Sequence, residues 1–190
     1  MGNVRQKIRL PLAELRDGQI AILELSPASD AETVRALDRS QQPQAREGTA
    51  LTTIDVVTPD QVDTGELIEL YDSVGWSVYS RDVGTLRRAL AGSSTLVIAR
   101  DSAVLIGLAR VVSDNATICY LQDVLVKPSH QGHGVGRALV QAALEPYAKV
   151  RQKVLLTDDE PAQRRFYESL GYSEAAVAAG GPLRAFVRFD

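Results

Sequence analysis

A glycine-rich segment, Gln131 to Arg137, is the part of the chain whose residue types and spacing could do chemistry. It reads Gln-Gly-His-Gly-Val-Gly-Arg, with glycines at alternate positions between a run of strand character and a run of helix character. A turn of this kind at a helix N-terminus offers free backbone N–H groups and the positive end of the helix dipole to an anion. The pattern predicts a phosphate-bearing ligand between residues 124 and 137, with a plain surface turn as the alternative.

Two familiar phosphate-binding motifs account less well for this segment. A nucleotide P-loop requires Gly-Lys-Ser/Thr, which does not follow these glycines. A dinucleotide fold needs an acidic residue about 20 positions further on, and Asp158 lies at the end of the next strand-like run. However, residues 127–131 separate the preceding strand from the first glycine, where that motif keeps the turn tight. Too few residues then remain after Asp158 for the rest of a doubly wound sheet.

The elements that must position this turn alternate between strand and helix patterns from residue 51 onward. Their order is β-α-α-β-β-β-α-β-α-β-β, which predicts a mixed, mostly antiparallel central sheet flanked by helices, an α/β (α+β) class. The expected strands are 51–57, 95–100, 104–112, 116–126, 153–157, 172–178 and 183–189, and the expected helices are 59–71, 82–90, 137–147 and 161–170.

Residues 1–50 differ in character from the rest and are expected to form an N-terminal extension of unknown role. A short strand is expected at 20–25 and a helix at 30–39, followed by a polar linker at 40–49. The folded domain is therefore expected to span residues 51–190.

Composition narrows the classes of protein. The chain has 190 residues, 45% apolar and 24% charged, which is ordinary for a globular domain. Its net charge of −3 argues against binding nucleic acid through bulk electrostatics. The single cysteine, Cys119, excludes an internal disulfide, and no apolar run is long enough to span a membrane. We expect no nucleic-acid or membrane partner and a cytoplasmic location.

Two sequence motifs together resemble those of the GNAT superfamily of N-acetyltransferases. Val126-Lys127-Pro128 followed by Gln131-Gly132-His133-Gly134-Val135-Gly136 looks like its acyl-CoA signature, Gln/Arg-x-x-Gly-x-Gly/Ala. Downstream, residues 166–172 read Phe-Tyr-Glu-Ser-Leu-Gly-Tyr and are similar to its Phe-Tyr-x-x-x-Gly-Phe/Tyr segment. The expected strand order also resembles that family's sheet. The resemblance covers residues 51–190 and leaves out the first 50.

The resemblance implies acetyl-CoA as a cosubstrate and no metal. In the family, the amides of the turn bind the pyrophosphate, and the preceding strand pairs with the pantetheine arm like an added strand. Such pairing requires the neighbouring strand to diverge, so that backbone groups stay free. The matching residues of this chain are Val124, Leu125, Val126, Gln131, Gly132, His133, Gly134, Val135, Gly136 and Arg137.

The implied reaction is acetyl transfer to a primary amine of a small molecule or peptide, by direct attack in a ternary complex. Tyr167 matches the family's usual general acid, and a well-placed phenol can protonate a departing thiolate. Asp123 is the candidate base, and the N–H of Leu125 is a candidate to polarise the thioester carbonyl. The alternative for Tyr167 is a tyrosine that packs beside Phe166, and the alternative for Asp123 is a structural carboxylate bonded to nearby backbone. Gln122, the neighbour of Asp123, cannot act as a base.

The sequence gives less information about the residues that bind the acceptor. Trp76 and Tyr79 are candidates for an aromatic wall around a cationic or aromatic amine, with a core or interface position of Trp76 as the alternative. One departure from the family pattern is Glu160, where many members carry an Asn that contacts CoA. Asp158 and Asp159 are expected to cap the helix that begins at Pro161, with contact to the substrate as the alternative.

Two function classes therefore stay open. The first is an N-acetyltransferase, with a homodimer as a candidate assembly because similar proteins often dimerise. The rival is a non-catalytic acyl-CoA-binding regulatory or interaction module, in which residues 1–50 contact a partner.

Overall fold

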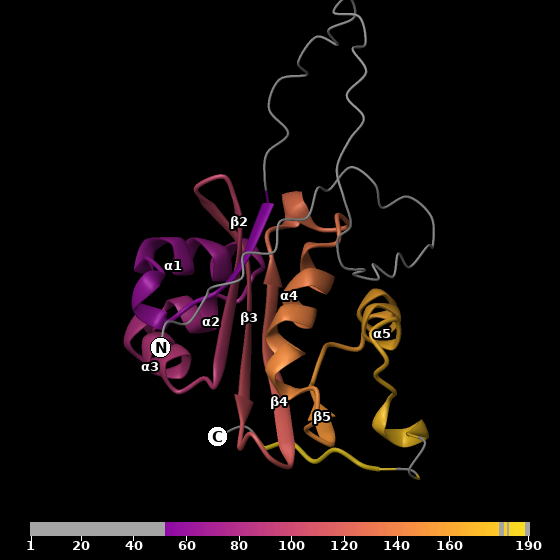
Figure 1. Ribbon diagram of the computed structural model, residues 1–190. Coiled ribbons are helices and arrows are strands. Elements are labelled where there is room, and N and C mark those ends of the chain that lie inside the picture. Colours follow the sequence, from indigo (N-terminus) through magenta and orange to yellow (C-terminus); the bar gives the residue numbers. More distant parts are fainter. Residues whose placement is uncertain (1–51, 179–180, 182, 189–190) are drawn as a thin grey trace, which may run out of the picture.

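The structure is a computed structural model that describes residues 52–178, 181 and 183–188 (Figure 1). The strand, helix and linker expected within residues 1–50 lie outside this range.

A five-stranded sheet forms the centre of the described chain, with its strands in sequence order (Figure 1). Neighbours from β1 to β4 pair antiparallel, and β5 pairs parallel with β4. Tight turns join the hairpins, and the left-handed residues Ser102 (φ 55°) and Asn115 (φ 61°) lie in them. The strands are β1 Thr52–Val56, β2 Thr95–Asp101, β3 Val104–Ser113, β4 Ile118–Val126 and β5 Gln152–Val154. This confirms the expected mixed, mostly antiparallel sheet.

Helices cover both faces of the sheet. Figure 1 shows α1, α2 and α3 on one side and α4 on the other, with α5 beside α4. The helices are α1 Thr64–Ser73, α2 Ser77–Ser80, α3 Val83–Ala91, α4 Val135–Leu144 and α5 Pro161–Glu168. The short 3-10 helices are η2 Pro59–Gln61, η3 Pro128–His130, η4 Glu145–Tyr147 and η5 Ala175–Val177. The helix expected from Pro59 begins later, because Asp63 caps α1 by accepting from Gly65 N and Glu66 N.

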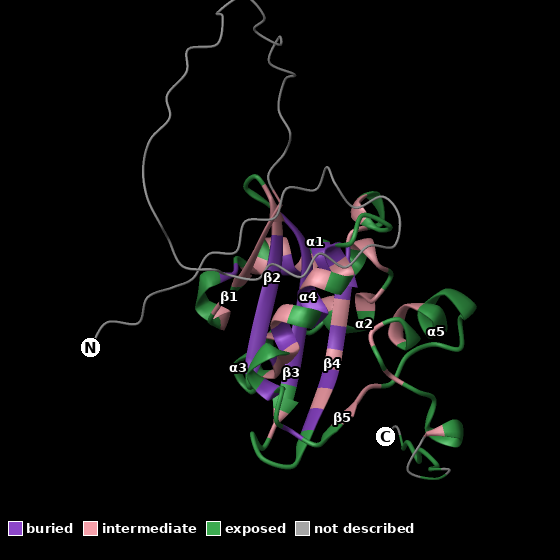
Figure 2. Cartoon of the chain, turned by 45° about the vertical axis from the view of Figure 1, so that its right-hand side comes forward, coloured by how far each residue is buried: buried purple, intermediate pink, exposed green. Residues whose placement is uncertain are grey.

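Each face of the sheet buries its own apolar cluster. Leu139, Val140 and Ala143 of α4 pack against one face, and Leu67 and Leu70 of α1, with residues of α3, pack against the other. Burying each such side chain stabilises the fold by about 1.5–3 kcal/mol. Figure 2 shows that β2 and β3, the central strands, are buried along most of their length. The two helical layers therefore hold the sheet rigidly in place.

Gly107 of β3 lets α4 approach the sheet closely. A Cβ at this position would lie 2.8 Å from Leu125 O and 2.9 Å from Leu139 Cδ1. Only a glycine leaves room for this packing. The start of α4 is thereby held against the end of β4, where the glycine-rich turn lies.

The two strands expected at the C-terminus are not found. Residues 172–178 contain η5 instead, and the described residues 183–188 form no strand. Leu183 N donates to Ala175 O, which ties this segment to η5 and not to β5. Its apolar side chains are exposed, and Phe186 is 90% exposed. Alternating apolar residues predicted strands here, but a strand also needs a paired neighbour, which this segment lacks within the described chain.

Candidate functional site

A β-bulge in β4 decides which of its side chains face α1. The register with β3 shifts at this point, and Gln122 is the extra residue. Because side chains alternate along a strand, one inserted residue moves all later side chains to the other face. Leu121 accordingly packs in the cluster on the α4 side, whereas Leu125 packs in the cluster under α1 and α3. The bulge therefore turns Asp123 toward α1.

β4 is paired with β5 only over its first three residues, and the rest of that edge is open. Parallel pairing with β5 joins only Ile118–Tyr120 to Gln152–Val154. From Leu121 to Val126, no strand of the described chain pairs with this edge. The divergence expected from the sequence is present, and it leaves backbone groups free for an added strand.

The alternation of the backbone identifies the groups that reach the open edge. Lys127 N donates to a β3 carbonyl at 2.8 Å, so Leu125, two residues earlier, also directs its backbone groups toward β3. Val124 and Val126 direct theirs to the open edge, where Val126 O accepts from Gln131 Nε2 at 2.9 Å. The N–H expected to polarise a thioester at Leu125 thus lies in the ladder with β3. Val124 offers its N–H at the open edge instead.

The glycine-rich turn has the backbone conformation that its glycines allow. Gly132 (φ 76°) and Gly134 (φ 81°) are left-handed, and a Cβ at either would meet no atom within 4 Å. α4 begins directly after Gly134, and its first hydrogen bond runs from Ala138 N to Gly134 O at 3.0 Å. The amides of residues 135–137 precede that bond and have no partner within the helix. Free amides at the start of a helix are an arrangement that favours an anion.

The polar side chains of the turn take different positions. Gln131 and His133 are exposed. Arg137 donates from Nη2 to Ser169 Oγ at 2.7 Å and from Nη1 to Ser169 O at 3.3 Å. Its guanidinium therefore links the start of α4 to the end of α5. The same group also places a positive charge near the turn.

Asp123 is buried in a network of side chains. It is 1% exposed, and its Oδ2 accepts hydrogen bonds from Tyr71 Oη, at 2.9 Å, and from Arg110 Nε. Arg110 comes from β3 and is 7% exposed, and Tyr71 comes from α1 and is fully buried. Burial and the charge of Asp123 raise the pKa of Tyr71, so its hydroxyl stays a donor at neutral pH. The partners of this carboxylate are side chains and not the backbone.

Tyr167 lies on α5, on the same side of the sheet as α4. It is half-buried, and its ring packs edge-on against two others. The ring centroids of Phe166 and Tyr172 lie 5.0 Å and 6.0 Å from its own. Burial raises the pKa of Tyr167, so the phenol keeps its proton at neutral pH. Phe166 approaches the start of α4, since a Cβ at Gly136 would lie 3.5 Å from its Cζ. The structure thus brings α5 and the glycine-rich turn together.

Trp76 and Tyr79 gather with Tyr71 around α2. The ring centroids of Trp76 and Tyr79 are 5.8 Å apart. The ring centroid of Tyr71 lies 6.4 Å from that of Trp76 and 5.7 Å from that of Tyr79. Trp76 packs partly against the cluster under α1 and α3, whereas Tyr79 is 39% exposed. Core packing and an aromatic wall are therefore both compatible with Trp76. The group lies directly beside the tyrosine that holds Asp123.

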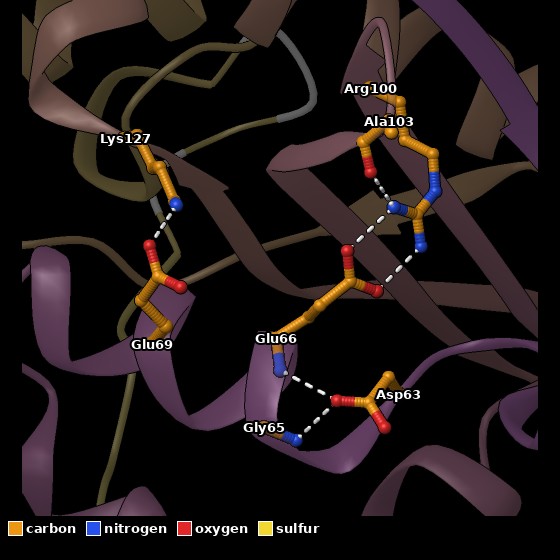
Figure 3. Close-up of polar contacts among 7 residues, drawn as sticks. All are labelled: Asp63, Gly65, Glu66, Glu69, Arg100, Ala103 and Lys127. Carbon is orange, nitrogen blue, oxygen red and sulfur yellow. Dashed lines mark hydrogen bonds and ion pairs between the residues drawn. The ribbon is translucent and has the colours of Figure 1, made fainter.

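Two ion pairs fasten α1 to the sheet (Figure 3). Arg100 binds both oxygens of Glu66 at 2.7 Å and also donates to Ala103 O at 2.7 Å. Lys127, between β4 and η3, pairs with Glu69. Figure 3 shows both glutamates on the same side of α1, reaching toward the sheet. The second pair connects the helix that carries Tyr71 to the chain entering the glycine-rich turn.

Other sequence candidates take no part in a cluster. Glu160 is the N-cap of α5 without a side-chain hydrogen bond, so the capping expected of Asp158 and Asp159 is wrong. Among the described residues, no group of three or more His, Cys, Asp or Glu is arranged to hold a metal ion. No helix in that part of the chain is long and apolar enough to cross a membrane.

Sequence reasoning missed Tyr71 and Arg110. Arg110 had a usable signal, because it is a lone charge within the apolar run of β3 and a charge in a buried strand needs a partner. Tyr71 had none, since nothing in the sequence distinguishes it from an ordinary core residue of a helix.

Comparisons with known proteins agree with this fold. A family model described as an acetyltransferase (GNAT) domain matches residues 92–174. The chain is 32% identical over 111 residues to an uncharacterized N-acetyltransferase, ycf52, of Pyropia yezoensis, covering 56% of this chain and 63% of that protein. The chain therefore spans less than two thirds of that relative.

Solved structures show the same architecture. A GNAT-family acetyltransferase, SP0256 of Streptococcus pneumoniae, superposes with a TM-score of 0.64 at 27% identity, covering 73% of this chain and 98% of that one. The aminoglycoside N-acetyltransferase AAC(6')-Iy, solved with CoA, shares the fold at a TM-score of 0.56 and 16% identity, covering 73% of this chain and 94% of that one. Over residues 92–174 the chain matches the GNAT acetyltransferase domain, and its fold is the one found in GNAT-family acetyltransferases.

Proposed function

We propose that this chain transfers an acetyl group from acetyl-CoA to a primary amine of a small molecule or peptide. The observation that carries the proposal is that the open edge of β4 leads directly into an anion-binding turn at the start of α4. A ligand with an amide-containing arm and a pyrophosphate matches that sequence of sites. The CoA-bound neighbour with the same fold supports this choice of donor.

The donor would lie along β4 and end at the turn. The amides of residues 132–137 would bind the pyrophosphate, because Gln131 N already donates to Pro128 O at 3.3 Å. Gly132 and Gly134 leave space for its approach. The backbone groups of Val124 and Val126 would pair with the pantetheine amides, in the way an added strand pairs with a sheet edge. Because Val126 O already accepts from Gln131, this side chain must turn away or share that oxygen.

The transfer would proceed by direct attack in a ternary complex. The nitrogen of the amine forms a bond to the thioester carbon, and the carbon–sulfur bond breaks. The nitrogen loses a proton to Asp123, directly or through a water, and the departing sulfur gains a proton from Tyr167. Exchange with solvent then restores both groups. The Val124 N–H would stabilise the negative charge on the carbonyl oxygen.

The acceptor would bind beside α2. Trp76 and Tyr79 offer aromatic faces next to Tyr71, and such faces attract cationic amines. The half-exposed edge of this group gives an acceptor access from solvent.

Thiol release from acetyl-CoA with a panel of amines and peptides tests the proposal, with acetyl-CoA affinity measured by calorimetry. We expect micromolar binding and release that depends on an amine. Binding without release on any amine would support the alternative, a non-catalytic acyl-CoA-binding module. The presence of Glu160 in place of the family's usual Asn favours that alternative.

Three further parts of the proposal need separate measurements. Residues 51–190 would form the catalytic domain, with residues 1–50 as an extension, and limited proteolysis tests that boundary. Light scattering tests for a homodimer. A cytoplasmic location, which the single cysteine favours, is tested by fractionation of the source cells.

A further inference from the structure

The two carboxylate oxygens of Asp123 differ: Oδ2 accepts two hydrogen bonds, and Oδ1 accepts none. In the described chain, only two buried side-chain oxygens lack a hydrogen-bond partner, and Asp123 Oδ1 is one of them. Buried carboxylate oxygens are nearly always paired, so an unpaired one indicates a missing ligand group or water. Both donors, Tyr71 Oη and Arg110 Nε, bind Oδ2.

The two donors to Asp123 Oδ2 are both held in place by their surroundings. Tyr71 is fully buried and packs with Leu67 and Leu70 in the cluster under α1 and α3, so its hydroxyl has little freedom. Arg110 is buried on β3 directly opposite Asp123 in the sheet register. With both donors fixed on one oxygen, rotation of the carboxylate is restricted and the free oxygen keeps one direction.

The same tyrosine also belongs to the aromatic group. Its ring contacts Trp76 and Tyr79, the residues proposed to face the acceptor. Tyr71 therefore touches both that group and the Asp123 carboxylate.

We propose that Tyr71 and Arg110 are positioning residues that hold Asp123 with Oδ1 turned toward the acceptor amine. This inference rests on the proposed function, because it assigns Asp123 as the group that receives the amine proton. The acceptor nitrogen, or a water bound to it, supplies the hydrogen bond that Oδ1 lacks. The titratable and charged groups that face Asp123 are Tyr71 of α1, Arg110 of β3, Tyr120 of β4 and, beyond Tyr120, Tyr79 of α2.

Tyr71→Phe tests this inference, with Tyr147→Phe as the matched control. Tyr147 is 2% exposed and its hydroxyl bonds Thr95 Oγ1 at 2.7 Å, on the opposite face of the sheet. Each substitution keeps the ring and removes one buried hydrogen bond. We expect a similar fall in Tm for both variants. Only Tyr71→Phe should lower kcat, by about tenfold or more, and shift the pH profile of kcat/KM for the amine, with acetyl-CoA affinity unchanged.

Arg110→Lys supplies a second variant, because it keeps the charge and removes the guanidinium geometry. We expect it to lower kcat in the same way as Tyr71→Phe. Equal kinetics for Tyr71→Phe and Tyr147→Phe, in an enzyme that acetylates amines, would overturn the inference.

A binding measurement separates this inference from the proposed function. The carboxyl carbon of Asp123, labelled with ¹³C, should shift on adding an amine to the wild type and not to Tyr71→Phe. Such a shift without any acetyl transfer would refute the proposed function and the role of Asp123 as a base, and would leave only an amine contact at Oδ1. No shift with any amine that the protein acetylates would refute the inference alone, and no shift together with no transfer would refute both.

Discussion

Arg110 of β3 and Asp123 of β4 form an ion pair inside the sheet's α1-facing layer, with side chains 9% and 1% exposed. The bulge at Gln122 makes this pairing possible, since without it Asp123 would face α4. A buried ion pair is costly to break, because the remaining charge is left without a partner.

Asp123→Ala should therefore destabilise the protein by about 3–5 kcal/mol, whatever it does to activity. Arg110→Met combined with Asp123→Leu should recover most of that loss, because apolar residues leave no buried charge. Urea unfolding of the single and double variants measures both. Arg164→Ala, which breaks an exposed pair with Glu168, should leave the midpoint unchanged. A single variant as stable as wild type would show that the pair is hydrated and not buried.

The sequence was sufficient for the parts of the fold that local patterns determine. The glycines, the helix after them and the alternating hairpins predicted the sheet and the turn at α4. The position of Tyr71 depends on contacts between α1 and β4, residues far apart in the chain, and no local pattern encodes them. The bulge at Gln122 likewise depends on pairing between strands, so no local pattern shows which side chains of β4 face α1. The prediction of two C-terminal strands was wrong for the same reason, because the sequence shows the alternation of apolar residues but does not show a pairing partner.

Gly134→Ala should weaken acetyl-CoA binding by about tenfold to a hundredfold. Its φ of 81° strains any residue with a Cβ, and that Cβ would enter the open space in front of the turn's amides. Gly75→Ala is the matched control, because Gly75 has a φ of 80° and equally open surroundings away from the turn. Calorimetry with CoA measures the affinity, and thermal unfolding measures the backbone strain. Equal losses of affinity in the two variants would contradict a pyrophosphate site at the turn.

Tyr167→Phe should lower kcat by about 10²- to 10⁴-fold, the usual contribution of a general acid. The ring contacts with Phe166 and Tyr172 stay, so Tm and the Kd for acetyl-CoA should change little. Stopped-flow single-turnover measurements would isolate the chemical step from product release. Tyr172→Phe serves as the control, because it removes a neighbouring buried phenol from the same aromatic group. A wild-type rate in Tyr167→Phe would leave Tyr167 as a packing residue.

Glu66→Gln should make the protein less sensitive to acid. Hydrogen bonds from Arg100 hold the pKa of Glu66 below its ordinary value in the folded state. A carboxyl whose folded pKa is depressed stabilises the protein above its unfolded pKa of about 4.3, and this contribution disappears as the pH falls through the folded value. Wild-type Tm should therefore decline on acidification below about pH 4.5 more steeply than that of Glu66→Gln. Glu69→Gln is the control, because Glu69 is mostly exposed and makes a single contact with Lys127, so its curve should follow the wild type. If all three curves coincide, the bidentate contact between Glu66 and Arg100 does not persist in solution.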